Sequence, residues 1–314
     1  MTSVSPALAF EPLLPIPTTI AYNRPKALLG RALFSDPILS LDKTISCASC
    51  HDLNQGGSDP APCSTGVKSQ QGVMQSPTVF NSVFNFRQFW DGRAADLKDQ
   101  VKGPIESEIE MQMTPVLVEQ RLNNSPDYLR AFRDVYGHNS IKFDEVTDAI
   151  AEFEKALITP NSRFDRFLRG EIALSSQENE GYLLFKELGC ITCHNGLNMG
   201  GNSFQKLGVL NPVIRDERYN DRFKLTLNER DLSVYKVPTL RNIELTSPYF
   251  HDGSKKDLHD ALKIMTFHNL GMDLTNKENN QLVAFLHTLT GQSPEILGIP
   301  SAWPELEQPP SPPE

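Results

Sequence analysis

The sequence predicts a mainly α-helical protein of two domains, with long loops and little β structure. Apolar residues recur at helical spacing in several segments, and N-cap and helix-stop residues flank them. Two Cys-x-x-Cys-His units begin at Cys47 and Cys190, each after a helical pattern. The chain has 314 residues, which is long enough for two hydrophobic cores. We therefore predict one domain around each unit.

The first half contains a proline-rich start and a long loop region. Residues 1–24 show no helical period and predict an extended arm. Residues 26–34 predict a short helix that leads to the first Cys-x-x-Cys-His unit. Residues 51–88 are rich in Gly, Ser, Asn, Gln and Pro. They predict a long loop, a kind of segment that often carries function.

Further helices follow along the chain. Ser125-Pro126 forms an N-cap and N1 pair. Ser175 and Glu178 form a capping box for a helix that leads to the second unit. The predicted helices run from 126 to 136, from 146 to 157, from 176 to 189, from 258 to 265 and from 282 to 289.

The domains are predicted as residues 1–159 and 160–314, joined near 159–170. The tail from Pro294 contains seven prolines and is expected to pack back on the first domain. The spacing of the two units alone does not establish that the domains are an internal duplication.

The bulk composition excludes two classes of function. The formal net charge is −9, whereas a nucleic-acid-binding protein needs a basic surface for phosphates. No run of about 18 apolar residues occurs, so no membrane span is predicted. With 39% hydrophobic and 22% charged residues, the composition is that of an ordinary globular protein.

The Cys-x-x-Cys-His units are the attachment signature of c-type haem. Each thiol bonds a vinyl group of the haem, and the histidine ligates the iron. A zinc site is the alternative, but it needs four ligands and only Cys63 is left over. We therefore predict two covalently bound haem c groups, held by Cys47, Cys50 and His51 and by Cys190, Cys193 and His194.

Haem attachment of this kind takes place outside the cytoplasm, so we expect a periplasmic protein. Residues 1–10 show neither a basic n-region nor an uninterrupted apolar h-region. We expect that a signal peptide has been cut away and that Met1 was added. The acidic charge could steer a basic electron carrier, although such charge more often serves only solubility.

Seven stretches carry a resemblance to a known family. They are 77–81 (PTVFN), 88–93 (QFWDGR), 103–105 (GPI), 110–111 (EM), 157–165 (LITPNSRFD), 237–242 (VPTLRN) and 248–253 (PYFHDG). In this order they resemble the bacterial dihaem cytochrome c peroxidases, a group that includes the MauG-like enzymes. The resemblance runs from Leu29 to Gly291. It implies a low-potential, peroxidatic haem in the first domain and a high-potential haem that supplies electrons in the second.

The resemblance also implies three catalytic residues. Trp90 would lie between the haems as the electron bridge, although a tryptophan is more often a core aromatic. Glu110 would take a proton from the near oxygen of bound peroxide and return it to the far oxygen, which requires a suitable pKa. Glu106 and Glu108 form a charge cluster with it that is ordinarily just solvated, so only the family register singles out Glu110. Gln100 matches a glutamine near the same pocket.

At the second haem, the resemblance implies Met265 as the sixth iron ligand, at the spacing from His251 that the family uses. A thioether ligand raises the potential of the iron, as an electron-supplying haem requires. A core methionine would equally suit its place on the apolar stripe with Leu258 and Leu262. The MauG branch has a tyrosine here, so methionine favours a peroxidase. His251 itself is expected to face the haem region.

A calcium ion between the domains is a further feature that the resemblance implies. The matching positions are Gln75, Thr246 and Pro248. The family usually has asparagine where Gln75 stands. Glutamine keeps the carbonyl oxygen but adds a methylene group.

One departure from the family concerns the first haem. Related peroxidases often close this iron with a histidine after a Ser-Thr-Gly-like turn, and this chain has Val67 there. Valine cannot ligate iron, so we expect a first haem that is open without reductive activation. Met74, Lys68 or Cys63 in the same loop could instead close it. A spare loop thiol more often forms an intermolecular disulfide or has no role.

We therefore expect a cytochrome c peroxidase that reduces hydrogen peroxide to water with electrons from a small c-type cytochrome or a cupredoxin. A MauG-like oxidase that modifies a protein side chain is the rival enzyme, favoured by the open first haem and disfavoured by Met265. A pure electron-transfer cytochrome is disfavoured because Val67 would leave one iron uncapped. A homodimer is an expectation from the family only.

Overall fold

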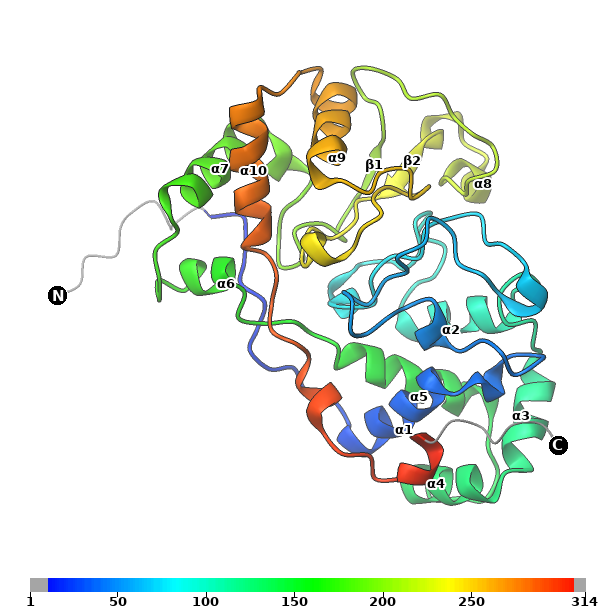
Figure 1. The fold of residues 1–314 in the computed structure, drawn as a ribbon. Helices are drawn as coiled ribbons and strands as arrows, with labels where there is room; N and C mark the ends of the chain where they lie inside the picture. The colour runs from blue at the N-terminus through cyan, green and yellow to red at the C-terminus, as the bar shows by residue number, and fades with distance from the viewer. Residues whose placement is uncertain (1–10, 308–314) are drawn as a thin grey trace.

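The computed structural model describes residues 11–307, and its fold confirms the mainly α-helical prediction (Figure 1). The helices are α1 (Arg24–Ser35), α2 (Leu97–Glu106), α3 (Pro115–Asn123), α4 (Pro126–Tyr136), α5 (Phe143–Lys155), α6 (Arg163–Leu168), α7 (Ser176–Glu187), α8 (Phe223–Thr226), α9 (Leu258–Met265) and α10 (Asn276–His287). Strands β1 (Phe204–Lys206) and β2 (Val234–Lys236) form one short antiparallel ladder. Residues 51–88 contain only two short 3-10 turns, as the predicted long loop requires.

Local capping signals account for the helices that the sequence predicted. Ser125 caps α4 and Gly137 ends it in the left-handed conformation, φ 83°, which glycine adopts without strain. Ser175 and Glu178 form the expected capping box of α7. Helix α10 begins earlier than predicted because Thr275 caps it as part of a second box.

The core of the first half centres on the crossing of α1 and α5. A Cβ atom on Gly30 would lie 1.9 Å from the carbonyl oxygen of Ala149 and 2.9 Å from the Cβ of Phe153. Only glycine therefore lets the two helices approach so closely. The first Cys-x-x-Cys-His unit packs on this core through Cys47 and Ala48.

The core of the second half repeats this construction with α7 and α10. A Cβ atom on Gly181 would lie 1.9 Å from the carbonyl oxygen of Gln281 and 3.0 Å from the Cβ of Phe285. Cys190 and Ile191 of the second unit pack against this core. Each haem motif thus follows the glycine-bearing helix of a close helix pair.

The two ends of the chain cross over, so that each supports the other half (Figure 1). Leu13 of the N-terminal arm belongs to the second core, and the backbone N–H of Ile16 donates to Asp165 Oδ1 at 3.0 Å. Ile296, Trp303 and Leu306 of the C-terminal segment belong to the first core. The predicted packing of the tail on the first half is therefore observed as far as 307, and the arm and tail residues 1–10 and 308–314 lie outside the described part. The domain boundary at 159/160 stays a prediction.

A repeat at a constant difference in residue number relates the two halves. Pro77 corresponds to Pro238 and Asn81 to Asn242, and both differences equal 161 (238 − 77 and 242 − 81). Both asparagines are left-handed, with φ 60°, and both donate from Nδ2 to the hydroxyl of Thr159, at 2.7 and 2.9 Å. This repeat offset also relates the first residues of α2 and α9 (258 − 97). The internal duplication that motif spacing left open is therefore visible in the fold.

Within residues 11–307, no helix has the length and apolar character needed to cross a membrane.

Candidate haem and catalytic sites

The first Cys-x-x-Cys-His unit borders a cavity of about 310 Å³. Cys47, Cys50 and His51 all line it. The Nδ1 atom of His51 lies 3.3 Å from the carbonyl oxygen of Gly57, so a protonated Nδ1 can donate there and leave Nε2 for iron. Burial lowers the pKa of His51, which keeps the imidazole in the neutral form that ligates metals.

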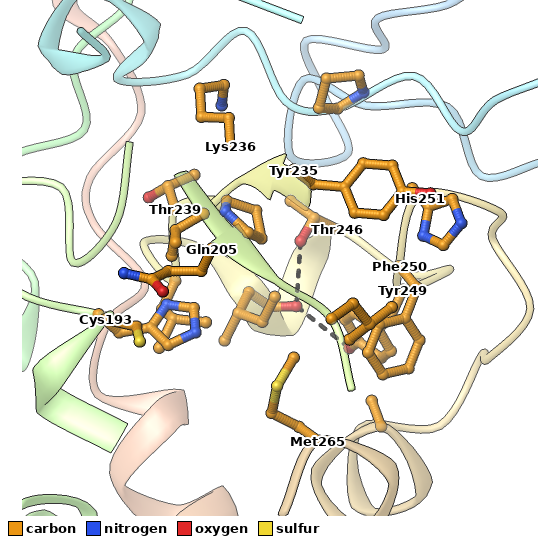
Figure 2. Close-up of a pocket in the computed structure, with 18 of the residues that line it drawn as sticks. Cys193, Gln205, Tyr235, Lys236, Thr239, Thr246, Tyr249, Phe250, His251 and Met265 are labelled. Atoms are coloured by element: carbon orange, nitrogen blue, oxygen red, sulfur yellow. Dashed lines mark hydrogen bonds between the residues drawn. The ribbon is translucent and has the colours of Figure 1, made fainter. Parts of the chain in front are cut away.

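The second unit borders a separate cavity of about 250 Å³ (Figure 2). Nδ1 of His194 lies 3.2 Å from the carbonyl oxygen of Met199, and burial lowers the pKa of this histidine to about 4. Cys190 and Cys193 line the same cavity, as does Met265 from the end of α9. The thioether of Met265 reaches into this cavity (Figure 2).

The residues present fit covalently bound haem. The four motif cysteines carry free thiols, each beside a cavity. A haem also brings two carboxylates, and Lys236 is a buried cation on the wall of the second cavity. Its pKa is lowered to about 8 by burial alone, and no carboxylate of residues 11–307 pairs with it. An anionic group in the cavity would satisfy this lysine.

Glu110, Gln100 and Arg93 come together in the first cavity. Burial raises the pKa of Glu110, while the charge of Arg93 and a hydrogen bond from Ser107 act against that rise. Arg93 stacks on Phe89, with the guanidinium carbon 3.5 Å from the ring centroid. The arrangement places an acid with a raised pKa and a cation next to the same space, as proton transfer to a bound substrate requires.

The loop that carries Val67 packs directly on the segment that holds Glu110. Val67 is fully buried but does not line the first cavity, and its backbone N–H donates to the carbonyl oxygen of Glu110 at 2.8 Å. Of the three alternative ligands in this loop, only Met74 lines the cavity. Lys68 instead donates to Gln112 Oε1 at 2.9 Å. Burial, and then the charge of Asp252, raise the pKa of the Cys63 thiol, which does not line the cavity.

Trp90 lines both cavities and lies at the junction of the two halves. Its indole N–H donates to the carbonyl oxygen of Gln75 at 2.9 Å, and its own carbonyl accepts from the backbone of Lys236 at 2.7 Å. His251, its counterpart at the repeat offset, lies edge-on to it with ring centroids 6.3 Å apart. The backbone N–H of Gln75 donates to the carbonyl oxygen of His251 at 3.0 Å.

The three residues expected at a calcium site, Gln75, Thr246 and Pro248, all line the second cavity. The side-chain amide of Gln75 donates to the carbonyl oxygen of Asp59 at 3.4 Å. The hydroxyl of Thr246 donates to Ile243 (Figure 2). No group of three or more His, Cys, Asp or Glu side chains forms a metal site in the described chain. Calcium here would depend on amide and backbone oxygens.

Sequence reasoning missed several residues that line these cavities. Lys236 and Glu154 are buried ionisable groups in the second and first cavity, respectively. Burial raises the pKa of Glu154 to about 8, and its Oε2 has no partner among residues 11–307. Pro104 lines the first cavity at the position that Met265 holds in the second (265 − 104 = 161). The two Phe-x-Asp-Gly segments, 89–92 and 250–253, differ by the same 161 residues. Aligning them would have paired Pro104 with Met265 from the sequence alone.

Three comparisons with known proteins point in the same direction. A family model described as di-haem cytochrome c peroxidase matches residues 24–173. Cytochrome c551 peroxidase of Nitrosomonas europaea is 47% identical over 289 residues, which cover 92% of this chain and 86% of that protein. The methylamine utilization protein MauG of Methylophilus methylotrophus is 29% identical over 298 residues, covering 90% and 88%. A crystal structure of a MauG-like protein associated with microbial copper homeostasis has a TM-score of 0.79 at 25% identity, covering 90% of this chain and 94% of that one.

Proposed function

Because the chain belongs to the dihaem cytochrome c peroxidase family, we propose that peroxide is reduced in the cavity that Glu110 and His51 share. The enzyme is an oxidoreductase that acts on peroxide, as its relatives' names indicate. The observation that carries the proposal is Glu110, an acid with a raised pKa on the wall of the cavity beside the first haem motif.

The protein's own residues have distinct tasks in this proposal. Haem iron at His51 supplies the redox chemistry that cleaves the peroxide bond. Glu110 takes the proton from the near oxygen of peroxide and returns it to the far oxygen, which leaves as water. Arg93 and Gln100 orient the substrate from the same cavity. Charge on Arg93 also limits how far burial raises the pKa of Glu110.

We propose that the first haem accepts peroxide without prior reductive activation. Val67 stands where a closing histidine was expected, and its side chain is buried against the Glu110 segment and does not line the cavity. Pro104 occupies the helix position at which the second half has Met265, and proline offers no ligand atom. Met74 is the only loop candidate that could still close the site.

The second half supplies the electrons in this proposal. Met265 is the expected sixth ligand of the haem on His194, and Lys236 is the expected partner of one haem carboxylate. Trp90 carries electrons from this cavity to the first, since its side chain lines both. The donor is a small c-type cytochrome or a cupredoxin, the location is the periplasm, and a calcium ion on Gln75, Thr246 and Pro248 supports the junction.

A MauG-like oxidase is the second candidate, because an open first haem suits it equally well. Two observations favour the peroxidase. The MauG of Methylophilus methylotrophus shares 29% identity with this chain, against 47% for the Nitrosomonas europaea peroxidase. Met265, rather than tyrosine, stands at the position of the second ligand.

Electron paramagnetic resonance of the ferric protein tests the open site. We expect one high-spin and one low-spin haem in the wild type, and two low-spin haems in the Val67→His variant. A Val67→Ile variant is the matched control and should keep the high-spin signal. Two low-spin haems in the wild type would overturn the open site. A Met74→Leu variant would then show whether this thioether closes it.

Steady-state turnover tests the reaction itself. Hydrogen peroxide should be reduced with reduced cytochrome c or a cupredoxin as donor, without a preceding reduction step. Absence of turnover, together with a long-lived oxidised state after peroxide, would favour the oxidase instead.

A further inference from the structure

Four aromatic side chains form a continuous cluster from the junction of the cavities toward the surface. Trp90 lies edge-on to His251, with ring centroids 6.3 Å apart. His251 stacks on Tyr235 at 4.3 Å and an interplanar angle of 23°, and the two rings lie side by side in Figure 2. Tyr219 meets the same imidazole at 4.9 Å and 90°. His251 thus contacts every other ring of the cluster.

Tyr219 is the outermost ring of this cluster. Trp90, His251 and Tyr235 line the cavities, whereas Tyr219 does not. The guanidinium of Arg218 lies 5.5 Å from the Tyr219 ring centroid, and the Arg218 side chain is 74% exposed. The ring is half-buried and therefore has access to water.

Tyr219 lies in a segment that is longer in the second half than in the first. The Cys-x-x-Cys-His units differ in number by 143 (190 − 47), whereas the Pro-Thr segments that follow them differ by 161 (238 − 77). The second half is therefore the longer one between these two landmarks. Its added length lies in residues 195–237, which include Tyr219. The corresponding segment of the first half, residues 52–76, contains no tyrosine.

We propose that Trp90, His251 and Tyr219 form a second route for electrons, between the surface and the junction of the two cavities. This route rests on the proposed role of Trp90 and serves when the macromolecular donor is absent. Each transfer moves one electron from Tyr219 through the His251 contact to oxidised Trp90. The phenol O–H bond breaks, its proton passes to solvent, and a neutral tyrosyl radical remains.

The oxidant for this step is hydrogen peroxide, the substrate of the peroxidase reaction. Peroxide takes up two electrons and two protons to become two waters, and Tyr219 supplies one of the electrons while the haem groups supply the other. Burial raises the pKa of Tyr235 and that of Tyr219. Loss of the phenolic proton is therefore coupled to loss of the electron. Contact with water favours Tyr219 over the cavity-lining Tyr235 as the site where the radical rests.

Freeze-quenched electron paramagnetic resonance of the holoenzyme tests the route. The ferric protein is mixed with peroxide without donor, once with natural tyrosine and once with ring-deuterated tyrosine. We expect a radical signal that narrows on deuteration and that falls at least tenfold in Tyr219→Phe. Tyr136→Phe in α4 is the matched control and should leave the signal unchanged. Donor-supported turnover of Tyr219→Phe should equal that of the wild type.

The possible results separate the route from the reaction. A signal that persists in Tyr219→Phe, or disappears only in Tyr235→Phe, overturns the exit at Tyr219. Peroxide consumption without any tyrosyl signal overturns the route while leaving the peroxidase reaction intact. Absence of both peroxide consumption and spectral change would instead contradict the proposed reaction at the first cavity.

Discussion

The two halves of the molecule share one scaffold and differ where each helix reaches its cavity. Helices α2 and α9 begin at the same place in the repeat, with Asp96 and Asp257 as their N-caps. The eighth residue is Pro104 in α2 and Met265 in α9, and each lines its own cavity. A thioether can ligate iron and a pyrrolidine ring cannot. In the proposed function, this single exchange of side chain leaves the first site open and closes the second.

The ionisable side chains buried beside the two cavities also differ between the two halves. Glu110 and Glu154 line the first cavity, and Lys236 lines the second. A carboxylate beside a redox group favours its oxidised, more positive state, whereas an ammonium group favours the reduced state. The charge of Lys236 therefore agrees with the high-potential second haem that the family implies, whereas Glu154, whose pKa is raised to about 8, carries no charge at neutral pH.

The largest effect is expected from Glu110→Gln, which removes the acid–base group from one half only. We expect the rate of peroxide reduction to fall about 10²–10⁴-fold, the usual contribution of a positioned acid–base group. The wild-type rate should also fall at low pH, as protonation of Glu110 removes the base. Stopped-flow mixing with peroxide measures both. Glu108→Gln, on an exposed neighbour, is the control, and an equal loss there would remove the special role of Glu110.

The shared scaffold is tested next, through the two glycines at the helix crossings. Gly30→Ala and Gly181→Ala should each destabilise the protein by about 1–3 kcal/mol or more, since overpacking outweighs the gain in helix propensity of about 1 kcal/mol. The new methyl group would lie 1.9 Å from a carbonyl oxygen in both cases. Thermal unfolding compares them with Gly298→Ala, which meets nothing within 4 Å. A strong destabilisation by only one of the two substitutions would contradict the structural equivalence of the two helix crossings.

Glu154, the buried acid beside the first cavity, should make the stability of the folded protein depend on pH. Its pKa is raised from 4.5 to about 8, so the folded state holds a proton that the unfolded state releases. The stabilisation of the folded state by this proton is fully present below about pH 4.5 and is lost as the pH rises toward 8. Glu154→Gln should therefore match the wild type at low pH and become more stable by on the order of 2 kcal/mol at pH 8. Unfolding of the exposed-site variant Glu187→Gln should show no such trend.

The smallest effect is expected from Lys236→Gln in the second half. Loss of one buried positive charge should lower the potential of the second haem by on the order of tens of millivolts, with little change at the first. Spectroelectrochemical titration measures the two potentials separately. Lys263→Gln on the exposed face of α9 should shift either potential less, because water screens that charge. An unchanged second potential in Lys236→Gln would contradict the proposed pairing with a haem carboxylate.

Capping and periodicity predicted much of the fold because these signals are local. Ser125 and Ser175 indicated α4 and α7, but α2 was not predicted because its sequence is polar and contains Pro104. Six of the seven motif stretches contain residues that line the cavities, and only 157–165 does not. Lys236 carried no local signal, since its burial depends on segments far apart in the chain. The repeat was hidden because the longer 195–237 segment makes the haem motifs and the later segments differ in offset.

The crossed ends of the chain constrain the order in which the protein can be completed. The first core needs Ile296, Trp303 and Leu306, which leave the ribosome long after the rest of that core. The second core needs Leu13, which emerges at the very beginning. If the chain is exported from its N-terminus, as the proposed periplasmic location requires, the first haem motif reaches the attachment machinery before Ile296, Trp303 and Leu306 can complete its core. Maturation of this half must proceed on a partly assembled chain, and neither half can be expected to survive excision at residue 159.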